Sequence, residues 1–364
     1  MRCAIVGSGL AAIAGYATLR HGGIRPEELT VFGTHEDPTA AWRERASAIR
    51  QRRMRSESDG HVAAAAFPGL AVRETLREGR LKPLLQTATN RYHPLVEDFV
   101  RHTGRVVHES GWERSFVRHR IERIRAVDGG FELDGEGPFE HVLVATGHPG
   151  LMRIPNAVHA YEPHEYASRV AIVGVGMAAA TEWLNALAAG AEVISIRRRE
   201  PLRRPLNVPR PYFSKRGLAS FHALSDNDRA TKLHELAAPS FPAGPEWDRP
   251  LASAASEGRL TILRGGSEEA QTWPPDLQVI CATGFRKGYS HDPLLADLVE
   301  AHDLPTHERW IVLDPDSTIP TLTDEARTLA LSGVAAQWAF PAADTIAGAK
   351  YAARAFLRRL CRTR

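Results

Sequence analysis

The sequence contains few cysteines and no long apolar run. Only three cysteines occur, Cys3, Cys281 and Cys361, and no two of them have CxxC or metal-ligand spacing. A disulfide framework, a dithiol redox centre and a metal site are therefore not expected, and this cysteine usage suits a reducing cytoplasm. No apolar stretch reaches the roughly 20 residues that a membrane-spanning helix needs. We expect a cytoplasmic protein without membrane contact.

A strong charge of one sign is also lacking. The net charge is only +3, with 24% charged and 43% apolar residues. This composition is that of a globular protein with a sizeable core, and it gives no reason to expect a nucleic-acid partner. The 364 residues are enough for two domains of ordinary size.

A glycine fingerprint opens the chain. An apolar run of strand length, residues 3–6, leads into a GxGxxA pattern formed by Gly7, Gly9 and Ala12. In such a pattern the first glycine makes a tight turn, the second lets the backbone approach a pyrophosphate, and the small third residue packs the helix on the strand. Leu10 begins the helix, whose free N–H groups face the phosphates. A single pattern of this kind is a weak signal of dinucleotide binding.

The same pattern occurs a second time. Residues 169–173 form another apolar run, and Gly174, Gly176 and Ala179 follow it, with Met177 at the expected start of the helix. Two such units in one chain predict two dinucleotides bound face to face, so that electrons pass between them.

An Ala-Thr-Gly segment follows each fingerprint at the end of a later apolar strand. The first consists of Ala145, Thr146 and Gly147, and the second contains Thr283 and Gly284. Glycine at such a strand end suits a close approach of the backbone to a cofactor. The repeated order of fingerprint and Ala-Thr-Gly is a stronger indication than any of its parts.

The second strand of the first unit lacks its usual acidic end. In FAD-binding units this strand ends in an acidic residue that binds the adenosine ribose. Here residues 29–32 lead to Gly33, which has no side chain. Glu36 and Asp37 are close in sequence, and Glu36 is the candidate ribose ligand.

The second strand of the second unit, residues 193–196, ends in three arginines. Arg197, Arg198 and Arg199 stand where an NAD-binding unit carries an acid. Guanidinium groups match the geometry of a phosphate, so NADPH with its 2′-phosphate is favoured over an exposed basic turn. The Pro-rich segment 201–249 follows, and its length suggests a lid or a binding loop.

Other segments complete a coarse prediction. His148 is interpreted as structural, and Asp344 as the cap of the last helix. Residues 151–168 read as a linker. The pattern further predicts a helix within 91–101, an antiparallel meander from 116–119, 121–127 and 130–133, strands at 141–144, 260–263, 277–280, 310–313 and 328–332, and a final helix that opens within 342–350 and runs to about 359. Residues 40–83 are less regular. Their basic stretch 43–55 is either a solvated basic helix with a loop or part of a loop system along the flavin, and the second interpretation is favoured.

Taken together, these motifs resemble the two-dinucleotide-binding-domain flavoproteins, most closely the flavin-containing and N-hydroxylating monooxygenases. The resemblance spans nearly the whole chain. The monooxygenase motif FxGxxxHxxxY is degenerate here, and Gly333 is followed by Val334 rather than by aspartate. The matching residues are Gly7, Gly9, Ala12 and Trp42 for FAD, both Ala-Thr-Gly segments, Gly174, Gly176, Ala179 and Arg197 to Arg199 for NADPH, and Gly333, Asp344 and Thr345 at the end that closes over the flavin ring.

The resemblance implies an α/β fold with two Rossmann-like domains and the cofactors FAD and NADPH. The FAD domain would comprise residues 1–153 and 282–364, with the NADPH domain, residues 154–281, inserted between them. The implied reaction is a monooxygenation, in which dioxygen forms a flavin C4a-hydroperoxide that oxygenates a nitrogen, sulfur or carbonyl centre of a small molecule. The resemblance identifies no catalytic acid or base, and a homo-oligomer is compatible with it.

Two alternatives stay open at the level of sequence. One is a dithiol-free NADPH-dependent flavin reductase or dehydrogenase that passes electrons to a ferredoxin, a quinone or a small molecule. The other is a non-enzymatic protein that binds FAD and NADP, for which the missing acid at Gly33 is the only support. Fold alone does not decide between these functions.

Overall fold

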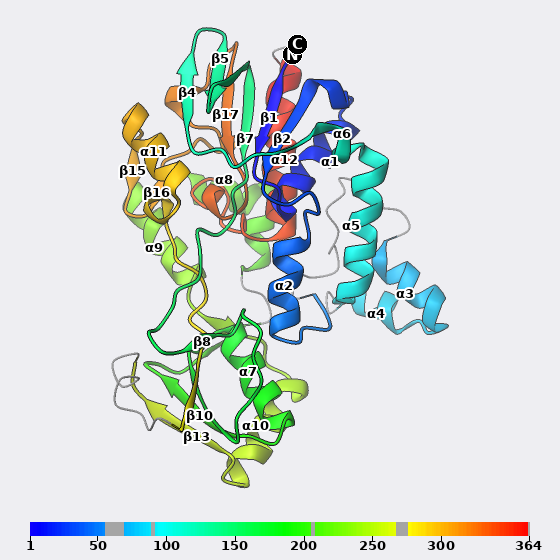
Figure 1. Ribbon diagram of the computed structural model, residues 1–364, viewed down its shortest axis with the longest axis vertical. Helices are drawn as coiled ribbons and strands as arrows, with labels where there is room; N and C mark the ends of the chain where they lie inside the picture. Colours follow the sequence, from blue (N-terminus) through cyan, green and yellow to red (C-terminus); the bar gives the residue numbers. More distant parts are fainter. Residues whose placement is uncertain (55–68, 89–91, 205–207, 267–275, 363–364) are drawn as a thin grey trace.

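The computed structural model describes residues 1–54, 69–88, 92–204, 208–266 and 276–362. Within these ranges the chain forms two five-stranded parallel sheets, in the upper and lower parts of Figure 1. The two termini lie side by side at the upper end. No helix in the ranges given is long and apolar enough to cross a membrane.

The first sheet is built from both ends of the chain, in the order β17-β7-β1-β2-β3. Alternate residues of β1 point to opposite faces: Ile5 joins the core under helix α1, and Val6 joins the core on the other side. Both faces are buried, which explains why these strands read as continuous apolar runs. The strands are β1 (Cys3–Val6), β2 (Leu29–Gly33), β3 (Phe116–Arg118), β7 (His141–Val144) and β17 (Thr328–Leu331).

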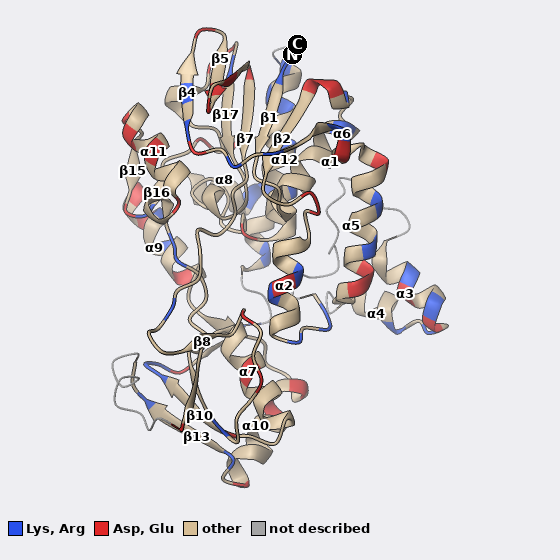
Figure 2. Ribbon diagram, viewed as in Figure 1, with Lys and Arg blue, Asp and Glu red and all other residues tan. Residues whose placement is uncertain are grey.

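Helices cover one face of this sheet. The first and last helices lie together in Figure 1, and a Cβ on Gly22 would lie 2.5 Å from the side chain of Leu357. Acidic and basic residues are interspersed on helices such as α3 and α5, in keeping with the small net charge (Figure 2). The helices of this unit are α1 (Leu10–His21), α2 (Ala40–Ala48), α3 (Leu70–Glu78), α4 (Lys82–Ala88), α5 (Val96–Ser110), α6 (Trp112–Ser115) and α12 (Ile346–Arg362).

A small antiparallel sheet packs on the other face. Its residues Phe131 and Phe139 share a core with Val142 and Val144 of β7. The elements on this side are β4 (Ile124–Val127), β5 (Gly130–Leu133), β6 (Glu136–Phe139), α11 (Pro293–His302), β15 (Thr306–His307) and β16 (Trp310–Ile311).

The second sheet has the order β13-β10-β9-β14-β8. Val170 and Ile172 of β9 pack under helix α7, and Ala171 and Val173 face the opposite core. The elements are β8 (Val158–His159), β9 (Arg169–Val173), α7 (Met177–Ala188), β10 (Glu192–Arg197), α10 (Pro245–Ser256), β13 (Leu260–Arg264) and β14 (Gln278–Cys281). The predicted linker 151–168 therefore contributes an edge strand.

The segment 201–249 forms a helical bridge between the two sheet units. The short strands β11 (Leu202–Arg203) and β12 (Ser240–Phe241) pair in parallel at its base. Phe221 and Leu233 from its helices share a core with Trp310 and Trp338 of the first unit. Between the strands lie the 3-10 turn η2 (Arg210–Phe213), α8 (Lys215–His222) and α9 (Asp226–Leu236).

The predicted meander is wrong in one strand. Residues 116–118 pair in parallel with β2 and form the edge of the first sheet, and the meander consists of β4, β5 and β6 instead. A short apolar run does not specify its partner, so the sequence gives no sign that this strand pairs with β2, which lies about 85 residues earlier in the chain.

Helix limits or caps differ from the prediction at three places. Within the basic stretch 43–55, the helix α2 ends at Ala48. The helix expected within 91–101 starts at Val96, because Pro94 disfavours helical backbone before it and Leu95 is an extended N-cap. The last helix starts at Ile346, so Asp344 does not cap it. The hydroxyl of Thr345 accepts the N–H of Gly348 at 3.1 Å in that role.

Candidate functional site

The two glycine fingerprints are built in the same way. Gly7 has φ +116° and Gly174 has φ +141°, a backbone conformation that favours glycine. A Cβ on Gly7 would lie 2.3 Å from the carbonyl oxygen of Ala145, and one on Gly174 would lie 2.5 Å from that of Ala282. The first glycine of each fingerprint is therefore packed against the alanine of the following Ala-Thr-Gly segment. This contact is the physical reason for the repeated order in the sequence.

Both fingerprints present an uncapped helix. Gly9 and Gly176 are the N-cap residues of α1 and α7, no side chain caps either helix, and neither first turn contains an acidic residue. Such an N-terminus attracts a phosphate through its N–H groups and its dipole. A Cβ on Gly9 would meet nothing within 4 Å, so there is room beside the first turn. Ala12 of α1 and Ala179 of α7 are fully buried. These features fit a pyrophosphate at each turn.

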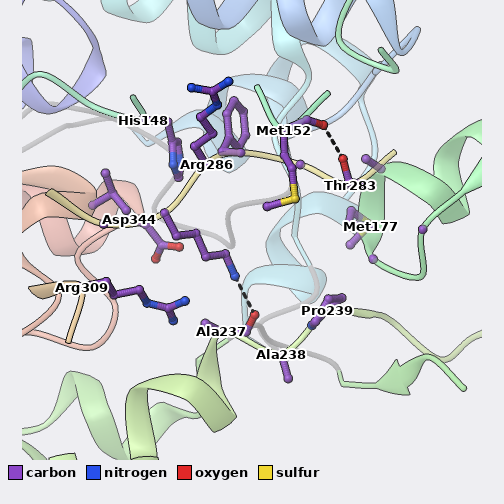
Figure 3. A pocket seen from close by; sticks show the side chains of 18 of the residues that line it. His148, Met152, Met177, Ala237, Ala238, Pro239, Thr283, Arg286, Arg309 and Asp344 are labelled. Atoms are coloured by element: carbon purple, nitrogen blue, oxygen red, sulfur yellow. Dashed lines mark hydrogen bonds between the residues drawn. The ribbon is translucent and has the colours of Figure 1, made fainter. Parts of the chain in front are cut away.

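A cavity of about 680 Å³ lies where the chain crosses between the two sheet units (Figure 3). Its wall combines the second fingerprint with residues of the first unit that follow β17. It also includes residues of the two segments where the chain crosses between the units, 147–154 and 282–289, here called the crossing segments. The sequence-predicted site residues that line it are Gly147, Gly174, Gly176, Met177, Arg197, Arg198, Thr283, Gly284 and Asp344.

A larger cavity of about 2520 Å³ adjoins the first one. Met177, Val208 and Asp344 line both cavities, so the two spaces meet at these residues. Thr345 and Ile346, at the start of α12, line the larger one. The N-terminus of the last helix therefore faces the junction.

Other predicted residues support the first turn without lining either cavity. The N–H of Ala145 donates to the carbonyl of Val6 at 2.7 Å, and the hydroxyl of Thr146 donates to Asp292 at 2.6 Å. Gly333 has φ +65°, and a Cβ there would lie 3.4 Å from that of Ala11, next to Leu10 in the first turn of α1. These contacts hold the turn in place from two sides.

Trp42 packs in the core of the first unit. Its ring lies edge-on to Phe99 of α5, with ring centroids 5.3 Å apart. The indole thus contributes to the packing of α2 on α5, and it lines neither cavity. Its role as an FAD ligand stays a prediction.

The side chain of Ser8 packs against Gly33 at the end of β2. A Cβ on Gly33 would lie 2.3 Å from the side chain of Ser8, whose hydroxyl accepts the N–H of His35 at 3.2 Å. Asp37 accepts the N–H and the hydroxyl of Thr39, so it holds the turn before α2. The side chain of Glu36 is exposed nearby, and its assignment as the ribose ligand stays a prediction.

The arginines after β10 line the cavity as a group. Arg197 forms an ion pair with Glu200 at 3.1 Å, and its own side chain is only 11% exposed. Its Nε–H has no acceptor in the part of the chain that the structure describes. Arg198 and Arg199 lie beside it on the same wall. The group can form charge-assisted hydrogen bonds to a phosphate.

An aromatic stack joins the two crossing segments. His148 and Phe285, which follow the two Ala-Thr-Gly segments, stack with ring centroids 4.1 Å apart. Tyr161 stacks on Phe285 at 5.2 Å, and the guanidinium of Arg45 lies 5.0 Å from the centre of the same ring. Burial, and then the charges of Arg45 and Lys287, lower the pKa of His148 to about 4. The imidazole is therefore neutral at pH 7, and its contacts give it a packing role.

The cysteines form no pair in the cavity. Cys3, Cys281 and Cys361 form no disulfide with one another. Cys281 is buried at the end of β14, where its thiol donates to the carbonyl of Met152 at 3.1 Å. Among the residues that the structure describes, no group of three or more His, Cys, Asp or Glu side chains is arranged to hold a metal ion.

Two cavity residues escaped the sequence reasoning. Lys287 follows the second Ala-Thr-Gly by three positions, a proximity that could have marked it. Arg309 lies between the short strands β15 and β16, far from every motif, and the sequence carries no signal for it. Figure 3 shows Arg309 and Asp344 on the same side of the cavity.

Comparison with solved structures finds this arrangement in flavin-dependent enzymes. An ornithine hydroxylase from Pseudomonas aeruginosa has a TM-score of 0.68 and 16% identity, with 99% of each chain covered. An ornithine N-hydroxylase from Kutzneria sp. 744, with reduced FAD, NADP⁺ and L-ornithine, has a TM-score of 0.69 and 15% identity, with 98% of this chain and 99% of that chain covered. The chain shares the fold of these monooxygenases.

Other comparisons limit what the structural similarity implies about the reaction. A bacillithiol disulfide reductase from Bacillus cereus covers 98% of this chain and 99% of its own, with a TM-score of 0.59 and 14% identity. No protein-family model and no sequence of a curated protein matches the chain. At these identities the similarity shows the two-unit α/β fold and leaves the reaction to the site.

Proposed function

We propose that this chain is an FAD- and NADPH-dependent monooxygenase that oxygenates a nitrogen, sulfur or carbonyl centre of a small molecule. The observation that carries the proposal is the common cavity, which the turn at Gly174 and Gly176 shares with Gly147, Val334 and Asp344 of the first unit. A coenzyme and a cofactor held at the two turns would face each other across it. The ornithine and lysine hydroxylases that share the fold support this reaction class.

The first unit, residues 1–153 and 282–364, would hold FAD. Gly7, Gly9 and the N-terminus of α1 would bind its pyrophosphate, and Glu36 its ribose. The N-terminus of α12, with Thr345, would face the ring oxygens. When bound, FAD supplies the hydride acceptance and the oxygen chemistry.

The second unit, residues 154–281, would hold NADPH. Its pyrophosphate would lie at the N-terminus of α7, and Arg197 and Arg198 would bind the 2′-phosphate. Met152, Met177 and Phe285 give the meeting point an apolar wall, which excludes water from the reaction. We assign no side chain as a catalytic acid or base.

A reductase is the second candidate function. Two bacillithiol disulfide reductases, from Bacillus cereus and Staphylococcus aureus, share the fold at TM-scores of 0.59 and 0.60. The separated cysteines of this chain suit a reductase that has no dithiol of its own.

Rapid mixing separates the candidates. The flavin-loaded protein is reduced with NADPH without oxygen and then mixed with aerated buffer that contains candidate amines and sulfides. A monooxygenase gives a transient flavin absorbance before the oxidised spectrum returns, and one oxygenated product for each NADPH consumed. Direct return to the oxidised spectrum with only hydrogen peroxide as product, together with turnover on a disulfide or a quinone, establishes the reductase. Failure to retain added FAD contradicts both.

A further inference from the structure

Two cations face the cavity without a carboxylate partner. Lys287 and Arg309 line the wall on the side of Asp344, and within the described ranges no acidic oxygen lies within ion-pair distance of either one. The ammonium of Lys287 donates to the carbonyl of Ala237 at 3.2 Å. The guanidinium of Arg309 lies 4.5 Å from the ring centre of Trp310. Neither of these contacts neutralises the charge.

The proposed coenzyme does not account for this pair. The 2′-phosphate of NADPH is assigned to the arginines after β10, and the pyrophosphate to the N-terminus of α7. Arg153, another cation on the cavity wall, is already paired with Glu162. The second acid of the wall, Asp292, caps α11 and accepts the hydroxyl of Thr146. Among the described residues of the cavity lining, Asp344 is therefore the one acid that is left to face Lys287 and Arg309.

The electrostatics of this corner favour a negative ligand. Enclosure in the cavity lowers the pKa of Lys287 and of Arg309, and the repulsion between the two cations lowers that of Lys287 further. Enclosure raises the pKa of Asp344 and the charge of Lys287 lowers it, and this one carboxylate faces two cations. Two cations in one corner of the cavity repel each other. An oxyanion between them would offset this repulsion through charge-assisted hydrogen bonds.

The pair comes from separate parts of the chain. Lys287 lies on the segment after the second Ala-Thr-Gly, Arg309 on the hairpin between β15 and β16, and Ala237 directly after α9. In Figure 3, the guanidinium of Arg286 points away from Asp344, although this residue lines the same cavity. Position in the cavity, rather than positive charge alone, distinguishes Lys287 and Arg309.

We propose that Lys287 and Arg309 bind an oxyanion of the substrate, a carboxylate or a phosphate. The substrate is then an acidic small molecule, which carries its anionic group beside Asp344 and presents its reacting centre to the flavin. The assignment of this oxyanion to a substrate rests on the proposed function. The same oxyanion chemistry could belong to a phosphate of the coenzyme, and the experiment distinguishes the two sources.

The test is a titration of the flavin-loaded protein with inorganic phosphate, at constant ionic strength and with saturating NADP⁺. Binding is followed by the thermal unfolding midpoint and by the difference spectrum of the flavin. We expect phosphate to bind the NADP⁺ complex, and the variants Lys287→Met and Arg309→Met to weaken this binding at least about tenfold. Lys287→Arg keeps the charge and should stay within about threefold of the wild type. Arg286→Met, the matched control, should stay within about twofold.

Three outcomes overturn the proposal. If the wild-type protein binds phosphate without NADP⁺ but not with it, the two cations bind a phosphate of the coenzyme. An equal loss in Arg286→Met shows a general charge effect. Unchanged phosphate binding in both Lys287→Met and Arg309→Met shows that these two residues do not form the phosphate site. Because no turnover is measured, phosphate binding in a protein that fails the rapid-mixing test would refute the monooxygenase and leave the anion site standing.

Discussion

The two glycine turns share one construction but have different surroundings. The first turn lies between its own sheet and the segment that follows β17, where a Cβ on Gly333 would lie 3.4 Å from that of Ala11. Gly7 and Gly9 line neither cavity. The second lines the cavity directly through Gly174, Gly176 and Met177. Gly9 of the first turn is exposed, whereas Gly174 and Gly176 of the second are half-buried on the cavity wall. The same local pattern thus lies in two different surroundings.

The strand ends that follow the turns differ as well. Ser8 fills the space beside Gly33 in the first unit, where no acidic side chain is present. In the second unit, Arg197 leads a group of three arginines on the cavity wall. We therefore expect backbone and packing contacts to dominate dinucleotide binding near Gly33 in the first unit, and charged side chains to contribute at the arginines of the second.

The largest expected effect tests what the two turns have in common. Alanine at Gly7 or at Gly174 puts a Cβ within 2.3 or 2.5 Å of a backbone carbonyl oxygen, at a positive φ. We expect each variant to lose at least about 3 kcal/mol of unfolding free energy, measured by urea unfolding. Gly23→Ala is the matched control, because Gly23 has φ +88° but open space around its Cβ. Equal losses in all three variants would show that the Ala-Thr-Gly contact does not matter.

The next effect separates the turns. Gly9 has φ −94° and ψ −164°, which valine adopts readily, and its Cβ direction is open. Gly9→Val should fold normally and lose FAD affinity by at least about a hundredfold, because the side chain occupies the pyrophosphate space. Flavin content after purification and the fluorescence of added FAD measure this loss. NADP⁺ binding, measured by calorimetry, should change less than about threefold, and a flavin-loaded variant would remove Gly9 from the site.

A smaller effect tests the charged strand end. Replacement of Arg197 and Arg198 by alanine should raise the KM for NADPH about tenfold or more, because two charge-assisted hydrogen bonds to the 2′-phosphate are lost. The KM for NADH, which lacks this phosphate, should stay within about twofold. Steady-state oxidation of the two coenzymes by the same preparations provides the comparison. Equal increases for both would place the arginines elsewhere on the coenzyme.

The smallest effect concerns the stack that joins the units. The pKa of His148 is about 4 in the folded protein, below its ordinary value near 6.5 in an unfolded chain. The unfolded state therefore binds a proton more readily, and stability declines as the pH falls from 7 towards 4. His148→Phe keeps a ring against Phe285 but does not titrate. Its unfolding midpoint should fall by less between pH 7 and pH 5 than that of the wild type, and an identical fall would exclude His148 as a contributor.

Much of the fold could be predicted because its signals are local. The run at β1 with Gly7 and Gly9, and the run at β9 with Gly174 and Gly176, each specify strand, turn and helix within about a dozen residues. The strand at 116–118 was predicted, but its place at the edge of the first sheet was not, since its partner is chosen by packing and not by its own residues. The helices of segment 201–249 were missed for a related reason. Their apolar residues, such as Phe221, pack on the distant first unit.

The candidate site divides in the same way. The glycines, the Ala-Thr-Gly segments and Arg197 were predictable because each has a fixed place in a local motif. The sequence places Asp344 both at a helix cap and in the segment that closes over the flavin ring. The structure gives the cap to Thr345 and places Asp344 on the cavity wall. Lys287 and Arg309 lie 22 positions apart in the chain and meet only through the hairpin that precedes β17.

The sequence by itself determined the two dinucleotide units, because the backbone demands of a tight turn and a helix N-terminus are met within a few consecutive residues. Only the tertiary structure decided which turn lines the cavity and which charges gather there. Burial, cavity shape and unpaired charge are properties of segments distant in the chain, and they exist only once those segments have packed together.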